Sequence, residues 1–453
     1  MRGVYQGRAA YDSPPVPNAA DIALLALLVP AVACTAYWAA ATLRIADSLR
    51  RLPTCRAGAA LPEPSGGWPA VCVIVPAHNE GAQIAGLVAS LRAQRYPRLS
   101  IVLALDRCTD DTEARARAAA EGDDRIEIIG IDRCPPEWAG KVHAVWSAVS
   151  RSPRAREAEL LLFADADTEF DPDCVRAAVA LLGARGLDML SLLSTLTSDR
   201  WFERAAQTAF SLELLRQYPL LSANRWPEPR PFANGQFMLF RRAAYERIGG
   251  HEAVRTALLE DIALARAVAL AGLRPGVLLA GGMLRCRMYD DWTGFRRGWK
   301  RIFIESTGRR SSRLLSLARR QAVSNFALPL ASLACFGVSA WTSLHPDPPF
   351  RLLDAAGLLI SGWALKSYLG AMLLALRAGR QPLWTAALQP IGGLLCAVVL
   401  RESALDLRRG KATAWGGRAY VLEDRDITQT SMWAPAPSIA EVPSPDAAPL
   451  PKP

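Results

Sequence analysis

Between residues 71 and 164, short apolar runs alternate with segments that have the pattern of helices. The runs of strand length are Val71–Val75, Ile101–Leu105, Ile126–Ile131 and Leu160–Ala164. The intervening helices are expected at about residues 81–94, from their apolar spacing, and 111–121, from their alanine content. Runs this apolar indicate strands that are covered on both faces. Strands that alternate with helices predict βαβ units, and hence an α/β domain with a mostly parallel sheet.

Much longer apolar stretches flank this region. Ile22–Leu43 contains no charged residue and is long enough to span a bilayer. We interpret it as an uncleaved anchor, because it lacks a clear small-residue cleavage site and lies well inside the chain. Three further candidate spans lie in the C-terminal third, at Asn325–Leu344, Leu352–Leu376 and Leu383–Leu400. The pattern predicts a multi-pass protein with N-terminal and C-terminal transmembrane helices around a globular domain.

Basic residues set the expected orientation. Several arginines closely follow the first stretch: Arg44, Arg50, Arg51 and Arg56. Since basic residues favour the cytoplasmic side, we expect a protein of the cell (inner) membrane whose globular domain is cytoplasmic.

The basic segment after the last apolar stretch conflicts with a simple count of spans. Three C-terminal spans would put this segment outside, against the same tendency; its basic residues are Arg401, Arg408, Arg409 and Lys411. Asp354 and Lys366 lie inside one stretch, and Gln389-Pro390 interrupts another. A re-entrant or interfacial segment is the alternative, and the number of spans stays open.

Composition narrows the classes of partner. The chain has 453 residues and a formal net charge of +10, which suits anionic lipids and phosphate-bearing substrates. It contains no nucleic-acid-binding motif, so we expect no nucleic acid partner. Its 9 cysteines show no Cys-x-x-Cys pairing, which argues against a zinc site or a disulfide framework and fits a reducing compartment.

Carboxylates follow three of the predicted strands. Asp165 and Asp167 come directly after the fourth strand, Asp106 ends the second, and Glu80 lies just after the first. Ligands of parallel sheets bind beyond the carboxyl ends of the strands, so we expect these acids at one edge. Two carboxylates as close as Asp165 and Asp167 repel each other unless a cation lies between them. A divalent ion that also binds phosphate oxygens is the usual solution.

The alternative is that these acids are turn and helix-cap residues. Asp171 and Asp173 follow the pair closely, and Asp110 and Asp111 precede a predicted helix. We prefer the capping role for Asp110 and Asp111, but not for Asp106.

Four motifs occur in order and with ordinary spacing: Val73–Glu80 (VIVPAHNE), Asp106–Thr112 (DRCTDDT), Asp165–Asp167 (DAD) and Leu259–Asp261 (LED). The series resembles the family 2 glycosyltransferases, which use an A-type, Rossmann-like nucleotide-sugar fold. The resemblance runs from about Pro69 to Arg309. Each motif alone is weak, but four in sequence are specific.

The resemblance implies a role for each acid. Asp106 would contact the nucleotide base, helped by the loop from Pro76 through Asn79 to Glu80. Asp165 and Asp167 would hold the donor diphosphate through Mg²⁺ or Mn²⁺. Asp261, beside Glu260, would be the catalytic base.

One base without a second nucleophilic carboxylate implies single displacement, and therefore inversion. The alternative for Glu260 and Asp261 is an acidic first turn of a helix over Ile262–Ala271, which the helix dipole favours.

Two further segments resemble parts of these transferases. Trp138-Ala139-Gly140-Lys141 resembles a loop in which Gly-Lys approaches phosphate, and a solvated lysine is the alternative. The segment Asn234–Arg242, with Gly235 and Gln236, resembles the acceptor side, as does the Ile248–His251 segment that follows it. For His251 a structural role is an equal alternative.

Trp292–Ile304 has aromatic residues near helical spacing, with basic residues around them. One interpretation is an interfacial amphipathic helix whose cations reach lipid head groups. The other is that Arg297, Trp299 or Lys300 closes over the acceptor or the departing diphosphate.

The same region departs from the polymerising members of the family. Processive polysaccharide synthases carry Gln-x-x-Arg-Trp here, whereas this chain has Phe295–Trp299 (FRRGW), which argues against a polymer synthase. Gly298-Trp299-Lys300 and the preceding Arg287-Met288-Tyr289 look more like transferases that glycosylate carotenoid- or hopanoid-type lipids.

We therefore expect a membrane-anchored, inverting, metal-dependent glycosyltransferase that moves one sugar from a nucleotide-sugar donor to a lipid hydroxyl or carboxyl. A UDP-sugar is favoured over a GDP-sugar. The alternatives are a polyprenyl-phosphate sugar synthase, a polysaccharide synthase and, from a different class, an inactive membrane scaffold or a transporter component. The expected organisation is an N-terminal tail and anchor (1–50), a linker (51–68), the glycosyltransferase domain (69–290), an amphipathic interfacial segment (291–323), transmembrane helices (324–401), and a basic and then disordered tail (402–453).

Overall fold

The computed structural model describes residues 19–64, 66–344, 352–415, 418–428 and 441–442. The chain divides into two compact units. The first consists of Met1–Thr42 and Ala327–Ala371, and the second of Leu43–Phe326 and Met372–Pro453. Each unit is described by itself.

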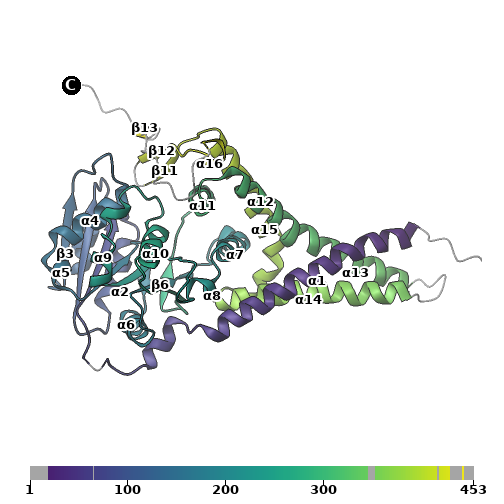
Figure 1. Ribbon diagram of the computed structural model, residues 1–453, viewed down its shortest axis with the longest axis horizontal. Coiled ribbons are helices and arrows are strands. Elements are labelled where there is room, and N and C mark those ends of the chain that lie inside the picture. The colour runs from purple at the N-terminus through teal and green to yellow at the C-terminus, as the bar shows by residue number, and fades with distance from the viewer. Residues whose placement is uncertain (1–18, 65, 345–351, 416–417, 429–440, 443–453) are drawn as a thin grey trace, which may run out of the picture. The chain divides into compact units, whose positions relative to one another are not determined.

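The second unit contains a seven-stranded sheet with the order β3-β2-β1-β4-β8-β6-β9 (Figure 1). Strands β1 to β4 pair in parallel, β6 and β9 also pair in parallel, and β8 runs antiparallel to both of its neighbours, β4 and β6. The strands are β1 Val71–Ala77, β2 Leu99–Asp106, β3 Ile126–Ile131, β4 Leu160–Ala164, β6 Met189–Leu193, β8 Phe237–Arg241 and β9 Pro275–Leu279. The predicted α/β domain with a mostly parallel sheet is confirmed.

Helices cover both faces of this sheet, because alternate residues of each strand point to opposite sides. Val71, Val73 and Val75 of β1 lie in one buried cluster with residues of α2 and α6, and α3 adds Ala116 to it. Cys72 and Ile74 lie in another with residues of α4, α5, α9 and α10. These helices are α2 Ile84–Arg92, α3 Thr112–Ala120, α4 Gly140–Arg151, α5 Pro153–Glu157, α6 Cys174–Ala184, α9 Arg242–Arg247 and α10 Glu260–Leu270.

Short elements complete this layer. A three-stranded sheet has the order β5-β10-β7, with β5 Thr168–Phe170, β7 Thr195–Leu196 and β10 Leu284–Cys286. Helical turns and one short helix connect the longer elements: η1 Cys55–Ala60, η2 Glu203–Gln207, α8 Leu220–Ala223 and η3 Glu252–Val254. β5 begins one residue after Asp167, so its pairing with β10 brings Cys286 opposite Thr168.

A helical cluster packs beside the sheet within the same unit. Its buried residues come mainly from α7, α11, α12 and α15, together with Trp138 and Val142 at the start of α4. The elements are α7 Thr208–Gln217, α11 Trp292–Ser306, α12 Ser311–Gln321, η4 Ala322–Ala327, η5 Leu383–Leu388 and α15 Gln389–Arg408.

The apolar stripe of α11, which we expected to face lipid, is buried in this cluster instead. Phe295, Trp299 and Phe303 are at most 3% exposed, and all three contact Phe210 of α7. The sequence pattern could not distinguish the two cases, because an amphipathic helix buries its apolar face equally well against lipid or protein.

Short elements occur in the segment that we expected to be a basic and then disordered tail. Thr413–Trp415 (β11) pairs with Arg418–Tyr420 (β12), β12 pairs with Glu441–Val442 (β13), and Arg425–Thr428 forms α16. Tyr420 and Leu422 are buried in the helical cluster. The carboxylates of Asp424 and Asp426 accept hydrogen bonds from the backbone amides of Ser311 and Ser312, which cap α12.

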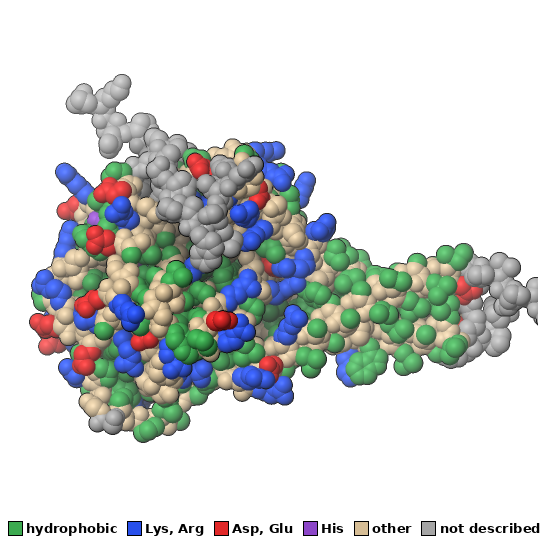
Figure 2. All heavy atoms as spheres, viewed as in Figure 1, with side chains coloured by type: hydrophobic (Ala, Val, Ile, Leu, Met, Phe, Trp, Pro, Cys, Tyr) green, Lys and Arg blue, Asp and Glu red, His purple; other side chains and the backbone are tan. Residues whose placement is uncertain are grey.

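The first unit is built from α1 (Ala19–Arg51, up to Thr42), α13 (Leu328–Leu344) and α14 (Leu352–Ala378, up to Ala371). Small and polar residues lie at its helix contacts: Thr342 Oγ1 donates to Asp354 Oδ1 (2.7 Å), and a Cβ on Gly357 would lie 2.0 Å from Ser339 Oγ. Its outer surface is mainly hydrophobic (Figure 2). Small residues inside and apolar residues outside are typical of helices that associate in lipid.

Within the described residues, four helical stretches are long and apolar enough to cross a membrane. They are Asp21–Ala60, Ser311–Leu344, Leu352–Ala378 and Leu383–Arg408. These stretches overlap the four that the sequence predicted.

Candidate active site

Several of the predicted site residues meet at one edge of the large sheet. Asp165 follows β4, and the N-termini of α4 and α10 bring Lys141 and Glu260 to the same point. β8 runs antiparallel, so its first residues, preceded by Gly235, lie at the edge where the parallel strands end. The topology thus gathers residues that are far apart in the sequence.

Lys141 lies at the centre of this cluster. Its Nζ is 2.6 Å from Asp165 Oδ1 and 2.5 Å from Glu260 Oε1. Burial alone would lower the pKa of Lys141, but the charges of Asp165 and Glu260 outweigh burial and raise the pKa, so the ammonium stays charged. Of our two interpretations, the solvated lysine does not fit, since the side chain is only 21% exposed.

Asp261 lies beside this ion pair and is partly exposed, whereas Glu260 is buried. Its Oδ2 accepts a hydrogen bond from the backbone amide of Gly235 (2.9 Å), and its Oδ1 accepts one from the amide of Ile262 (2.7 Å). Burial and the neighbouring charge of Glu260 raise the pKa of Asp261 to about 7. A carboxylate with a pKa near neutrality can accept a proton at physiological pH. Glu260 and Asp261 are the first two residues of α10. The alternative, in which they form an acidic first turn, also requires this position.

Asp167 has an unsatisfied oxygen, since its buried Oδ1 has no hydrogen-bond partner among the described residues. Burial, and then the charges of Asp165 and Glu80, raise the pKa of Asp167 to about 8. The same two effects, burial and Asp165, raise the pKa of Glu80 to about 7. Three carboxyl groups that repel one another beside an unpartnered oxygen fit a cation.

The protein alone offers few ligands for such a cation. Among the described residues, no group of three or more His, Cys, Asp or Glu is arranged to hold a metal. Asp165 and Asp167 together therefore fit an ion such as Mg²⁺, which binds one or two carboxylates and completes its coordination with substrate phosphates and water.

The expected base-binding loop follows β1 and β2. Asp106 is buried at the end of β2 and forms a bidentate pair with Arg107 (2.9 and 2.7 Å). Asn79 has a positive φ of 56°, and its Oδ1 accepts a hydrogen bond from the backbone amide of Thr109 (2.8 Å). This bond joins the loop after β1 to the loop after β2. Pro76 does not end β1 as we expected, because it remains in register opposite Ala104 of β2.

Asp110 has the capping role that we preferred for it, whereas the side chain of Asp111 makes no capping hydrogen bond and pairs with Arg115. Asp110 Oδ1 accepts hydrogen bonds from the backbone amide and the hydroxyl of Thr112, the first residue of α3. Asp171 accepts the amide of Asp173, whose carboxylate pairs with Arg95.

Two residues of the expected acceptor side are buried. Gln236 is 4% exposed, and its Oε1 accepts a hydrogen bond from Asn234 Nδ2 (3.0 Å). His251 is 1% exposed and packs against Phe163, while its Nδ1 lies 2.9 Å from the hydroxyl of Tyr245. Burial, and then the charge of Lys141, lower the pKa of His251 to about 3, so this ring is neutral.

The three expected residues of α11 do not come together. Trp299 lies in the buried aromatic cluster, and Lys300 Nζ pairs with Asp406 (2.7 Å) and Glu402 (3.2 Å) of α15. Arg297 is exposed.

Sequence reasoning missed three neighbours of the acids. Arg107 pairs with Asp106, although its place directly after a strand-end acid was a usable signal. The Cys286 thiol is buried and interacts with Asp167, and that charge contributes to the raised pKa of the thiol after burial itself. Tyr289 is adjacent to Gly298, where a Cβ would lie 2.1 Å from the Tyr289 hydroxyl. The latter two positions depend on strand pairing and helix packing, which no local pattern encodes.

Residues 72–249 match the sequence model of Glycosyl transferase family 2. This part of the chain is a family 2 glycosyltransferase domain. The resemblance drawn from the four motifs and the expected A-type fold are thereby confirmed. The matched residues of this glycosyltransferase domain include Glu80, Asp106, Lys141, Asp165 and Asp167, and they end before Glu260.

The chain is also similar to individual proteins. It is 26% identical over 244 residues to 4,4'-diaponeurosporenoate glycosyltransferase of Staphylococcus aureus (strain MRSA252), covering 53% of this chain and 62% of that protein. The proteins of the same name from strains USA300 and Newman have the same identity and coverage. The match thus spans less than two thirds of the length of these relatives.

Solved structures show weaker likeness. A mannosyltransferase from Pyrobaculum calidifontis in complex with GDP-Man and Mn²⁺ is 19% identical, with a TM-score of 0.44, over 84% of this chain and 98% of that one. S. aureus TarS 1-349 in complex with UDP-GlcNAc is 14% identical, with a TM-score of 0.37, over 82% of this chain and 99% of that one.

Proposed function

We propose that this glycosyltransferase moves a single sugar from a nucleotide-sugar donor to a hydroxyl or carboxyl of a carotenoid- or hopanoid-like membrane lipid, with inversion at the anomeric carbon. The observation that carries the proposal is the cluster in which Asp165, Lys141, Glu260 and Asp261 meet beyond the end of β4. The name of the Staphylococcus aureus relatives supports a carotenoid-type acceptor.

The donor would lie across the ends of β1, β2 and β4. Asp106, with Asn79 and the loop after Pro76, would contact the nucleotide base. Asp165 and Asp167 would hold Mg²⁺ or Mn²⁺, which neutralises the charge of the leaving diphosphate. Lys141, already charged between two carboxylates, would orient Asp165 toward that group.

Asp261 would act as the general base. Its carboxylate would take the proton of the acceptor hydroxyl as the acceptor oxygen forms its bond to the anomeric carbon, and the nucleoside diphosphate would leave with the electrons of the broken bond. The amide of Gly235 donates to Asp261 Oδ2, and the amide of Ile262 donates to Oδ1. Oδ1 would face the acceptor as the freer oxygen only after it releases the amide of Ile262. A carboxylic acid acceptor is already ionised near neutral pH and would depend less on this base.

The first test is nucleotide binding by calorimetry to the purified full chain in detergent, with UDP and GDP compared with and without Mn²⁺. We expect Mn²⁺-dependent binding of one nucleotide, with UDP favoured, that Asp167→Asn weakens by more than tenfold. Asp173→Asn is the matched control, since this acid follows the same strand but pairs with Arg95 at the surface. Absence of binding by any nucleoside diphosphate would overturn the donor site.

The second test identifies the acceptor. The full chain in lipid vesicles receives radiolabelled nucleotide-sugar and, separately, a carotenoid carboxylic acid, a hopanoid alcohol or a polyprenyl phosphate. Label in one of the first two supports the proposal. Label only in the polyprenyl phosphate, or in a product longer than one sugar, would replace it by the corresponding synthase.

A further inference from the structure

We infer that the bilayer contacts α1, α13 and α14 but not α15, so that the chain crosses the membrane three times and the basic segment after α15 lies on the same side as the glycosyltransferase domain. This inference concerns membrane topology and does not depend on the proposed substrate. It rests on the packing of α15 and on its polar contacts.

The uninterrupted apolar part of α15 is short, although together with η5 it belongs to one of the four stretches that are long enough to cross a membrane. Between Pro390 and Arg401 only Ile391–Leu400 is free of charge and proline. Ten helical residues extend about 15 Å, about half of the hydrocarbon thickness. The apolar residues before them belong to η5, a separate 3₁₀-helix that ends at Leu388.

The first turn of α15 contacts protein too closely for lipid to intervene. A Cβ on Gly392 would lie 2.1 Å from the carbonyl oxygen of Ala205 in η2, and one on Gly393 would lie 2.2 Å from Cβ of Asn325 in η4. All four residues belong to the second unit. Glycine permits this approach because it has no side chain.

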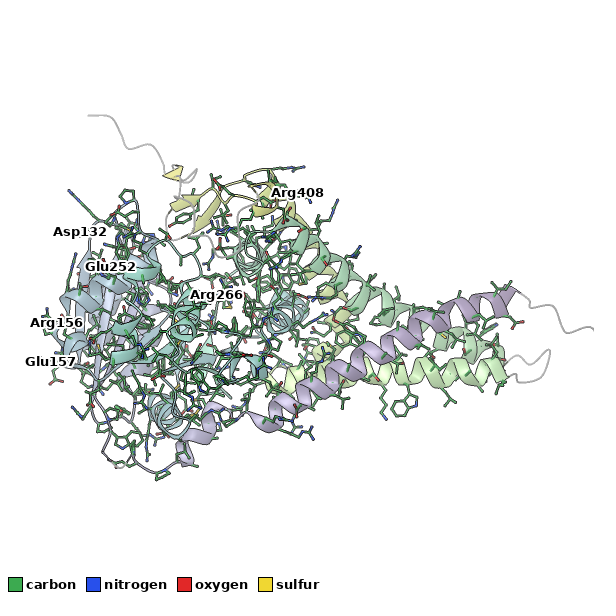
Figure 3. All side chains as sticks on the ribbon, in the orientation of Figure 1. Asp132, Arg156, Glu157, Glu252, Arg266 and Arg408 are labelled. Atoms are coloured by element: carbon green, nitrogen blue, oxygen red, sulfur yellow. The ribbon has the colours of Figure 1, made fainter. Side chains whose placement is uncertain are left out.

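The last turns of α15 are joined to the same unit by polar contacts. Arg296 of α11 forms a bidentate pair with Glu402, and Lys300 pairs with Asp406. Arg408 Nε donates to Ser311 Oγ of α12 (2.9 Å), and Figure 3 labels Arg408 at this end of α15. Both ends of α15 therefore lie against the unit that holds the glycosyltransferase domain, whereas a spanning helix has its ends on opposite sides of the bilayer.

Exposed apolar side chains alone do not separate the helices of the first unit from α15, where Ile391 is 52% and Val398 46% exposed. Large apolar side chains on α1, α13 and α14 are more than half exposed, among them Val29, Leu333, Trp341, Leu359 and Trp363.

Three crossings also remove the conflict in the distribution of basic residues. Basic residues then flank every span on the side of the domain, and the segment after α15 joins them there, as the positive-inside rule requires. These residues are Arg44, Arg50 and Arg51 after α1, Arg319 and Arg320 before α13, Arg377 and Arg380 toward the end of α14, and Arg401, Arg408, Arg409 and Lys411 on and after α15.

The test uses three full-length variants, each with one epitope tag. The first tag follows Pro453, the second follows Asp347 between α13 and α14, and the third follows Gly122, which lies in an exposed turn with open space around it. Protease is added to sealed inside-out vesicles and to spheroplasts, and nucleotide binding checks that each variant is folded.

We expect the Pro453 tag to be cleaved in the same preparation as the Gly122 tag, and the Asp347 tag in the other. Four crossings predict that the Pro453 tag is cleaved together with the Asp347 tag, and this result would overturn the inference.

A packing test needs no inserted tag. Gly392→Leu should lower the melting temperature by roughly 5 °C or more, because its side chain would clash with η2. Gly370→Leu in α14 is the control, since no atom lies within 4 Å of a Cβ there, and it should change the melting temperature by about 2 °C or less. Equal tolerance of the two variants would mean that α15 is open to lipid, and would also overturn the inference.

Discussion

Lys141 and Glu260 form an ion pair with 2.5 Å between Nζ and Oε1, although 118 positions separate them in the sequence. Because Glu260 is 4% exposed at its side chain, the pair lies away from water and each charge depends on the other. Lys141 also reaches Asp165, so one ammonium links the end of β4 to the start of α10.

Removal of Lys141 should therefore damage both stability and donor binding. Lys141→Ala would leave two carboxylates facing each other without a cation, and breaking a buried pair costs about 3 kcal/mol of the free energy of unfolding. We expect this loss in denaturant unfolding, together with nucleotide affinity reduced by more than tenfold.

Arg125→Ala is the control for Lys141→Ala, because it breaks a bidentate pair with Asp123 beside the start of β3. It should lower stability and leave nucleotide affinity unchanged. Equal nucleotide affinity in Lys141→Ala and the unmodified chain would contradict the role of Lys141.

The transfer rate should rise with pH through about 7. The pKa of Asp261 is raised to about 7, and a base must be unprotonated to accept the proton of a hydroxyl acceptor. We expect the rate at saturating donor to fall about tenfold per pH unit well below 7 and to level off above it. Nucleotide affinity measured over the same range separates this effect from metal and donor binding.

The same shift predicts an effect of Asp261→Asn on stability. The folded-state pKa of Asp261 is above its ordinary value of 3.8, so the folded protein binds this proton more tightly than the unfolded chain does. Its contribution to stability therefore declines as pH rises from about 4 to 7. Asp261→Asn should abolish that decline, together with transfer, while nucleotide binding persists. An active Asp261→Asn enzyme would require another base.

A side chain at Gly235 should disturb the cluster sterically. A Cβ there would lie 2.9 Å from Lys141 Nζ and 3.2 Å from Glu260 Oε1, and Lys141 cannot yield freely because two carboxylates hold it. Gly235→Ala should reduce the transfer rate by more than tenfold. Gly183→Ala is the control, since it lies in α6 with open space around it among the described residues. It should leave the transfer rate unchanged and raise stability by at most about 1 kcal/mol, because alanine favours a helix over glycine.

The buried pair of Tyr245 and His251 should matter for stability in acid. The pKa of His251 is lowered to about 3, so the unfolded chain takes up a proton near pH 6.5 that the folded protein takes up only near 3. Stability is lost as pH falls through this window. His251→Gln should have a smaller loss between pH 6.5 and 4 in thermal unfolding, and an unchanged slope would mean that the ring is already charged in the fold.

The sequence predicted the half of the sheet that consists of β1 to β4, because these strands follow the local alternation of apolar runs and helices. Ile126–Ile131 was predicted with the bounds that β3 has, and the strand before Asp165 was also correct. The other half was missed, because β6, β8 and β9 are short and β8 inserts antiparallel between β4 and β6. Only that insertion brings Gly235 to Asp261, so the residue types of the site were predictable and this contact was not.

The burial of Tyr420 and Leu422 also limits how far the chain can be shortened. Both side chains fill the helical cluster, and Asp424 and Asp426 satisfy the first amides of α12. A protein engineered to stop after Arg409 would lack both side chains and would expose the apolar part of the helical cluster that they bury. Trimming for expression or crystallisation should therefore begin beyond Thr428, and a proteolytic cut before Tyr420 should release an aggregation-prone product rather than a smaller stable enzyme.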